Sequence, residues 1–244
     1  MKLLFMLAGS IFVVTATAST PVSVRYTPTS AYGVENIYGF SFLVSPESAK
    51  HASKLQELRS ELKTQLSSIN KSLPTNAIQK LRSTRIWIEW QVNNDSAAEF
   101  HLSREWLAAN YYNPDKYRSV EINNTANFIS WSQDNQPSML LHELAHAYLA
   151  SATQQDQHLV DSAYNSAVKS KLYESVAYSD GKNVRAYALN NSNEYFAELT
   201  EAFFGRNDFY PFVRSDIEKH DPQGYNLMLL LWGVSPAAAQ TAKF

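Results

Sequence analysis

The chain has 244 residues, of which 45% are hydrophobic and 13% aromatic, enough to form a packed core and too apolar for a disordered protein. Its formal net charge is -2 and no block of like charges occurs, which argues against nucleic acid as the main partner. The absence of cysteine excludes thiolate metal ligands and a cysteine nucleophile, so any metal site must use His, Asp and Glu.

The N-terminal eighteen residues have the pattern of a secretory signal peptide. Lys2 supplies the positive start, residues 3–14 are mostly apolar, and Ala-Thr-Ala at residues 16–18 fits the small-x-small cleavage pattern. The apolar run is too short to span a bilayer. We therefore expect a signal peptide over residues 1–18, secretion to the extracellular space, and no membrane attachment after cleavage. An uncleaved anchor or a buried N-terminal helix is the alternative.

The next part of the chain predicts an arm, a strand and a helix. Residues 19–34 are rich in Thr, Ser and Pro and predict an extended arm, followed by a single domain over residues 35–244. Residues 37–44 predict a strand or a packed aromatic segment. Residues 45–72 begin with Ser-Pro and then carry leucines at helical spacing, which predicts a long amphipathic helix.

Strands are predicted in the middle of the chain. Residues 85–90 alternate apolar side chains with Trp and Glu, and residues 117–122 and 127–131 are also interpreted as strands. Residues 101–110 predict a short helix or a loop. Strands followed by helices favour an α+β fold, with a small mixed sheet packed on the helix that begins after Pro137.

The C-terminal half is expected to be mainly helical. Residues 154–157 predict a turn, followed by a helix over residues 158–174. Ser192 or Asn193 can cap a further helix that extends through Phe204. Between these two helices, residues 184–189 are ambiguous between strand and loop. A shorter helix opens at Pro211, and the apolar residues 227–232 are expected in the core.

The most informative motif is His142-Glu143-x-x-His146, the His-Glu-x-x-His pattern of zinc peptidases. Residues four apart project from the same face of a helix, so both imidazoles can bind one metal ion. The glutamate is placed to act on a water at that metal, which makes Glu143 a candidate general base. The motif therefore predicts a zinc site that needs a third ligand.

A second helix offers that ligand. Glu194, Glu198 and Glu201 share one helix face at i, i+4 and i+7. The simplest assignment makes Glu194 the third ligand and Glu198 the acceptor for the second ring nitrogen of a ligating histidine. The swapped assignment, with Glu198 as the ligand, stays open. We expect Glu201 to be a solvated charge.

These two motifs resemble those of the gluzincin metallopeptidases, in particular the catalytic domain of anthrax lethal factor and the Pro-Pro endopeptidases. That group takes its third ligand from the first Glu of a Glu-aromatic-Phe-Ala-Glu helix, which corresponds to Glu194. It also places a transition-state tyrosine seven residues earlier, which corresponds to Tyr187. The likeness covers roughly residues 140–205 and implies a zincin-like fold.

The sequence thus predicts a secreted zinc metallopeptidase that acts on a peptide or protein substrate. His142, His146 and Glu194 would bind Zn²⁺, Glu143 would be the base, and Tyr187 would donate to the oxyanion. A non-cleaving, zinc-stabilised binding or toxin-like module and a zinc hydrolase of non-peptide amides are the alternatives.

Other polar features give weaker expectations. We place the substrate beside an edge strand at residues 127–130. The remaining histidines lack partners at ligand spacing and are expected on the surface or hydrogen-bonded in the core: His51, His101, His158 and His220. Asn-x-Ser/Thr sequons begin at Asn70, Asn94, Asn123 and Asn190. Nothing in the sequence indicates the oligomeric state.

Overall fold

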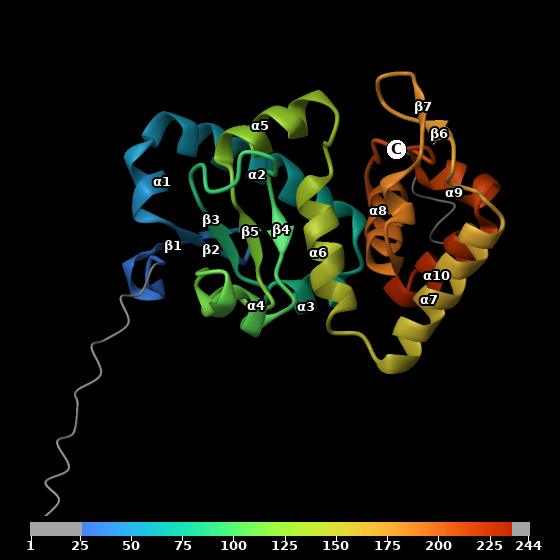
Figure 1. Ribbon diagram of the computed structural model, residues 1–244, viewed down its shortest axis with the longest axis horizontal. Coiled ribbons are helices and arrows are strands. Elements are labelled where there is room, and N and C mark those ends of the chain that lie inside the picture. Colours follow the sequence, from blue (N-terminus) through green and yellow to red (C-terminus); the bar gives the residue numbers. More distant parts are fainter. Residues whose placement is uncertain (1–25, 236–244) are drawn as a thin grey trace, which may run out of the picture.

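The computed structural model describes residues 26–235 and has a mixed α+β architecture that is 55% helical. A five-stranded sheet lies at one end of the molecule and a group of helices at the other, with α6 (Met139–Leu149) between them (Figure 1). The predicted small mixed sheet and mainly helical C-terminal half are confirmed. The predicted signal peptide and the first part of the predicted arm lie outside the described residues.

The sheet has the strand order β1-β2-β3-β5-β4. Its strands are β1 (Gly33–Ile37), β2 (Phe40–Val44), β3 (Ile86–Ile88), β4 (Glu99–Phe100) and β5 (Val120–Ile122). Neighbouring strands β2, β3 and β5 run parallel, whereas β1 and β4 pair antiparallel at the two edges. The short edge strand β4 is the one closest to α6 and becomes important at the site.

The segment predicted as one strand over residues 37–44 is the turn and second strand of a hairpin. Tyr38 and Gly39 form a two-residue loop, with φ of 51° and 87°. Positive φ at both loop positions gives the twist that two-residue hairpins favour. The predicted arm is also shorter than expected, because a 3₁₀ turn at η1 (Thr29–Ala31) leads directly into β1.

The helical prediction for residues 45–72 holds, with one interruption. Helix α1 (Pro46–Lys50) is capped by the Ser45 hydroxyl, and α2 (Ala52–Ser72) follows. The leucines of α2 are buried against the core, as their spacing predicts. Pro74 then precedes a further helix, α3 (Thr75–Leu81).

The strand predicted at residues 127–131 is wrong, since these residues belong to helix α5 (Thr125–Asp134). Asn124 caps this helix by accepting a hydrogen bond from the Asn127 backbone N–H. Residues 117–122 are also predicted as a strand, and only their second half, β5, is extended. Residues 101–110 contain the short helix α4 (Arg104–Ala109), followed by the 3₁₀ turn η2 (Pro114–Lys116).

The two faces of the sheet differ in character. One face packs its aliphatic side chains against α2, α5 and α6 in the main core. The other buries Trp87 and Glu121 beneath η2 and the N-terminal segment. There Lys116 Nζ lies 2.5 Å from a Glu121 carboxylate oxygen and 2.7 Å from one of Glu89, and His101 binds Glu121. His101 is therefore a hydrogen-bonded core residue, as predicted.

The C-terminal half contains four further helices and a small hairpin. The helices are α7 (Gln154–Lys169), α8 (Ser192–Phe204), α9 (Arg214–His220) and α10 (Pro222–Trp232). The hairpin consists of β6 (Val176–Ala177) and β7 (Asn183–Val184) and is followed by the 3₁₀ turn η3 (Tyr187–Leu189). The turn predicted at residues 154–157 is instead the first turn of α7, because Thr153 and Asp156 form a capping box.

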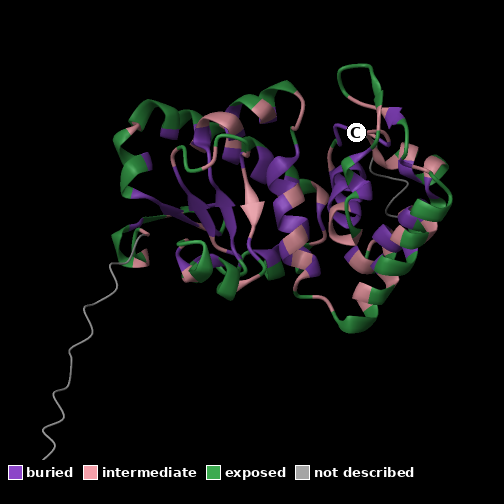
Figure 2. Ribbon diagram, in the orientation of Figure 1, coloured by how far each residue is buried: buried purple, intermediate pink, exposed green. Residues whose placement is uncertain are grey.

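Helix α8 packs against α6, and most of its residues are buried. Ten of its thirteen residues are buried, and Figure 2 shows most of it in the buried colour. Its N-cap is Asn191, one residue before Ser192 and two before Asn193, the two predicted caps. Among residues 26–235, no helix combines the length and apolarity needed to cross a bilayer. The sequon residue Asn123 is fully buried, so the folded chain does not present it for glycosylation.

Candidate metal centre

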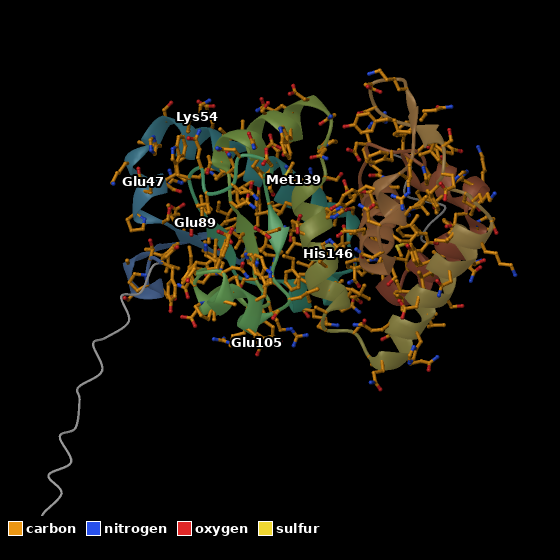
Figure 3. The ribbon with its side chains drawn as sticks, viewed as in Figure 1. Glu47, Lys54, Glu89, Glu105, Met139 and His146 are labelled. Carbon is orange, nitrogen blue, oxygen red and sulfur yellow. The ribbon has the colours of Figure 1, made fainter. Side chains whose placement is uncertain are left out.

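Helix α6 presents the two histidines of the motif toward α8. The apolar side chains of Leu140 and Leu144 anchor the opposite side of α6 in the core. His142 and His146 lie one turn apart, with ring centroids 4.8 Å from each other. Their side chains retain 12% and 11% exposure, enough to be reached from solvent. Figure 3 shows His146 on α6.

Glu194 of α8 completes a cluster with these two rings. The Asn191 side chain accepts hydrogen bonds from the Asn193 and Glu194 backbone N–H groups, which places Glu194 in the first turn of α8. One Glu194 carboxylate oxygen lies 3.0 Å from His142 Nε2 and 3.2 Å from His146 Nε2. Hydrogen bonds from both histidines outweigh burial and hold the pKa of Glu194 below its ordinary value.

The geometry of this cluster fits zinc. Ligand atoms at ~2.0–2.1 Å from a tetrahedral ion lie about 3.3 Å from one another. The two distances from Glu194 to the histidine nitrogens are close to that separation. Two imidazoles and one carboxylate are also the donor set of many catalytic zinc sites, which leave a fourth position open. The residues present therefore fit the ion that the motif implies.

The second ring nitrogen of His142 has a partner that the sequence analysis missed. His142 Nδ1 lies 2.7 Å from a Glu201 carboxylate oxygen and 3.8 Å from the nearest oxygen of Glu198. Glu201 is only 4% exposed, so the expectation of a solvated charge is wrong. Glu198 accepts a hydrogen bond from the Asn207 side chain instead. An Nδ1–H donated to Glu201 leaves Nε2 of His142 as the metal-binding atom.

Glu143 supplies the buried carboxylate of the motif. It is 7% exposed, and no described residue donates a hydrogen bond to it. Burial raises its pKa, although the neighbouring histidines oppose this. A raised carboxyl pKa close to a reactive water suits a general base, because the carboxylate must accept and then release a proton.

Tyr187 lies at the opening of the site. It begins the turn η3, its ring centroid is 6.3 Å from that of His142, and it is 46% exposed. Burial of the remaining part of the side chain raises the pKa of its hydroxyl. The hydroxyl is therefore a neutral donor at physiological pH, available to a ligand in the cleft.

Two cavities meet at the cluster. Their volumes are about 330 Å³ and 360 Å³, and both are lined by His142, Glu143 and Tyr187. Both also contact Ser96 and Ala98, in the segment that leads into β4. They are thus two ends of one cleft that crosses the candidate metal-binding residues. The ends are called the deep cavity, bounded by Asp208 and Phe209, and the outer cavity, bounded by Glu194.

The strand beside this cleft is not the predicted one. Residues 127–130 are helical and cannot offer a sheet edge. The edge strand that lines the outer cavity is β4, through Glu99 and Phe100. With only two residues, β4 is too short for an alternating pattern to be recognised in the sequence.

Two other groupings of His and Glu exist in the described part of the chain. Glu99, His101 and Glu121 lie together, but the ammonium group of Lys116 already occupies the Glu121 carboxylate. The other grouping is His142 with Glu198 and Glu201, which shares His142 with the main cluster. His142, His146 and Glu194 all line the outer cavity, whereas Glu198 and Glu201 line the deep cavity.

Comparisons with known proteins give no relative for this chain. No family model, no curated protein and no solved structure matches it. Function therefore has to be inferred from the chemistry of the cleft.

Proposed function

We propose that the chain is a zinc-dependent metallopeptidase with a zincin-like catalytic domain. The observation that carries this proposal is the convergence of His142, His146 and Glu194 within ligand distance, beside the unpaired carboxylate of Glu143. The signal-like pattern of residues 1–18 makes secretion part of the proposal.

Zinc held by these residues would supply Lewis acidity, polarising the scissile carbonyl and making the attacking water more acidic. Glu143 accepts a proton from that water and delivers it to the leaving amine. Glu201 keeps His142 in the tautomer that binds through Nε2. Tyr187 donates a hydrogen bond to the developing oxyanion from the mouth of the cleft.

The proposed substrate is an extended peptide. Strand β4 lies at the edge of the sheet and lines the outer cavity beside Glu143 and Glu194. An exposed edge can bind an extended chain through backbone hydrogen bonds, with the side chains entering adjacent cavities. A peptide laid along β4 would bring one amide bond over the metal-binding residues, which favours an endopeptidase.

The proposal is tested by cleavage of a peptide library with the full chain and added zinc. Wild type is expected to cleave, a chelator to abolish cleavage, and zinc to restore it. Glu143→Gln is expected to bind zinc as wild type does but to lose cleavage by at least about 1,000-fold. Glu105→Gln, on the surface of α4, is the matched control and should cleave normally. Full activity of Glu143→Gln, or no cleavage by wild type, would contradict the proposal.

A further inference from the structure

The deep cavity has an unusual lining. Its carboxylates come from Asp95, Glu143, Glu198, Glu201 and Asp208. The outer cavity adds Glu99 and Glu194. Neither cavity is lined by a Lys or an Arg, although the whole chain has 21 of them against 23 acidic residues. The excess of acidic over basic side chains is therefore a property of the cleft and not of the chain.

A zinc ion would be held by only one of the acidic side chains of the cleft. The cleft is lined by seven of them, and Glu194 is the proposed ligand. The buried carboxylates of Glu198, Glu201 and Asp208 bind Asn207, His142 and Gln136, and none of them pairs with a Lys or Arg among the described residues. Burial raises the pKa of Asp208, and an ammonium or guanidinium group placed beside this side chain would favour its charged form and be attracted to it.

The walls of the deep cavity are suited to the same kind of ligand. Trp131, Tyr178 and Phe209 all line it, and the Tyr178 and Phe209 ring centroids are 4.8 Å apart. Aromatic faces attract ammonium and guanidinium groups and pack against the methylene chains that carry them. Asp208 is 3% exposed and accepts a hydrogen bond only from the neutral Gln136 amide among the described side chains.

We propose that the deep cavity binds a Lys or Arg side chain of the substrate, at a position next to the cleaved bond. The methylene chain lies against Trp131 and Phe209, and the cationic group approaches Asp208. This inference rests on the proposed peptidase function, because it assigns a subsite of that cleft. It makes basic peptides the preferred substrate class, and Asp208 the residue that determines this preference.

The test uses peptides that are acetylated at the N-terminus and amidated at the C-terminus, so that side chains alone carry charge. Lys, Arg, norleucine, Gln or Glu is placed at each position flanking the cleaved bond. At one of these flanking positions, wild type should cleave the peptide with Lys or Arg with a kcat/KM about 30-fold above that of the norleucine peptide. The preference should weaken at high salt. Equal cleavage of the Lys, norleucine and Glu peptides would overturn the inference while leaving the peptidase function intact.

Substitutions assign the preference to the cavity. Asp208→Asn keeps an acceptor for Gln136 but removes the charge, so it should lower kcat/KM for the Lys peptide to about that for the norleucine peptide. Asp161→Asn makes the same charge change on the exposed side of α7 and should retain the full preference. An unchanged Lys preference in Asp208→Asn would overturn the assignment.

Binding separates the two proposals. Calorimetry with the zinc-loaded Glu143→Gln protein measures affinity without turnover. The Lys peptide should bind more strongly than the norleucine peptide, and this difference should disappear in a protein that also carries Asp208→Asn. These two results would support the cation subsite even if wild type cleaves nothing. Equal affinities would overturn it, whatever the outcome for cleavage.

Discussion

Replacement of Glu201 probes the part of the proposed metal site in which the structure differs from the sequence-based expectation. His142 Nδ1 lies 2.7 Å from Glu201 and 3.8 Å from Glu198, so only Glu201 is within hydrogen-bond distance. A hydrogen bond to a charged acceptor contributes roughly 1 kcal/mol more than a neutral one. Glu201→Gln keeps an acceptor but loses the charge, and is expected to weaken zinc binding about 10-fold. Glu201→Ala loses both and should weaken it about 100-fold.

The assay is competition with a chromophoric chelator at constant pH, with circular dichroism to check that each variant is folded. Glu198→Gln is the matched comparison one turn away on α8, and its zinc affinity should stay within about 3-fold of wild type. A larger loss of affinity in Glu198→Gln than in Glu201→Gln would refute the reasoning and restore Glu198 as the partner of His142.

Three further predictions concern the tyrosine and the buried ion network. In steady-state assays, Tyr187→Phe should lower kcat by about 100-fold and leave KM within about 3-fold of wild type, and its zinc content should be unchanged. An unchanged kcat would remove Tyr187 from the mechanism. Lys116→Met leaves Glu89 and Glu121 buried without their cation, and should lower the free energy of unfolding in urea by about 3–5 kcal/mol, whereas the exposed Lys182→Met should change it by less than about 0.5 kcal/mol. Burial raises the pKa of Glu121, but the His101 hydrogen bond and the Lys116 charge outweigh it and leave this pKa below its ordinary value. The pKa of Glu121 is thus lower in the folded than in the unfolded protein. The contribution of Glu121 to the free energy of unfolding is therefore fully present above the unfolded pKa near 4.5, and it is lost as the pH falls toward the folded pKa. Urea titrations should show this acid loss in wild type and a smaller one in Glu121→Gln, and equal losses in the two proteins would contradict it.

The placement of His142 and His146 on one helix face could be predicted because it depends on local spacing, whereas Glu194 is expected beside them partly from the gluzincin resemblance. Two helices, each identifiable from its own pattern, carry the three side chains on single faces. The depth of Glu201 could not be predicted in this way. A helix face seen in the sequence does not reveal how closely distant segments pack on it, and α8 is enclosed by α6, α7 and α10.

The errors in the sheet have a similar origin. Phe128, Ile129 and Trp131 favour a strand by residue type, but the Asn124 cap and packing on α2 stabilise a helix. β4 could not be predicted because its two residues carry no periodic signal. As a result, the sequence placed the edge of the cleft in the wrong segment, although the three residues it predicted as metal ligands do lie together in the cleft.

Metal analysis of the purified full chain tests the central proposal most directly. After equilibration with zinc and removal of free metal, wild type should retain about one zinc ion per chain, as a three-ligand site predicts. Glu194→Ala and His146→Ala should lose it while remaining folded, and Glu105→Ala should retain it. A wild-type chain without zinc, or a Glu194→Ala chain that binds it as tightly as wild type, would contradict the assignment of this site.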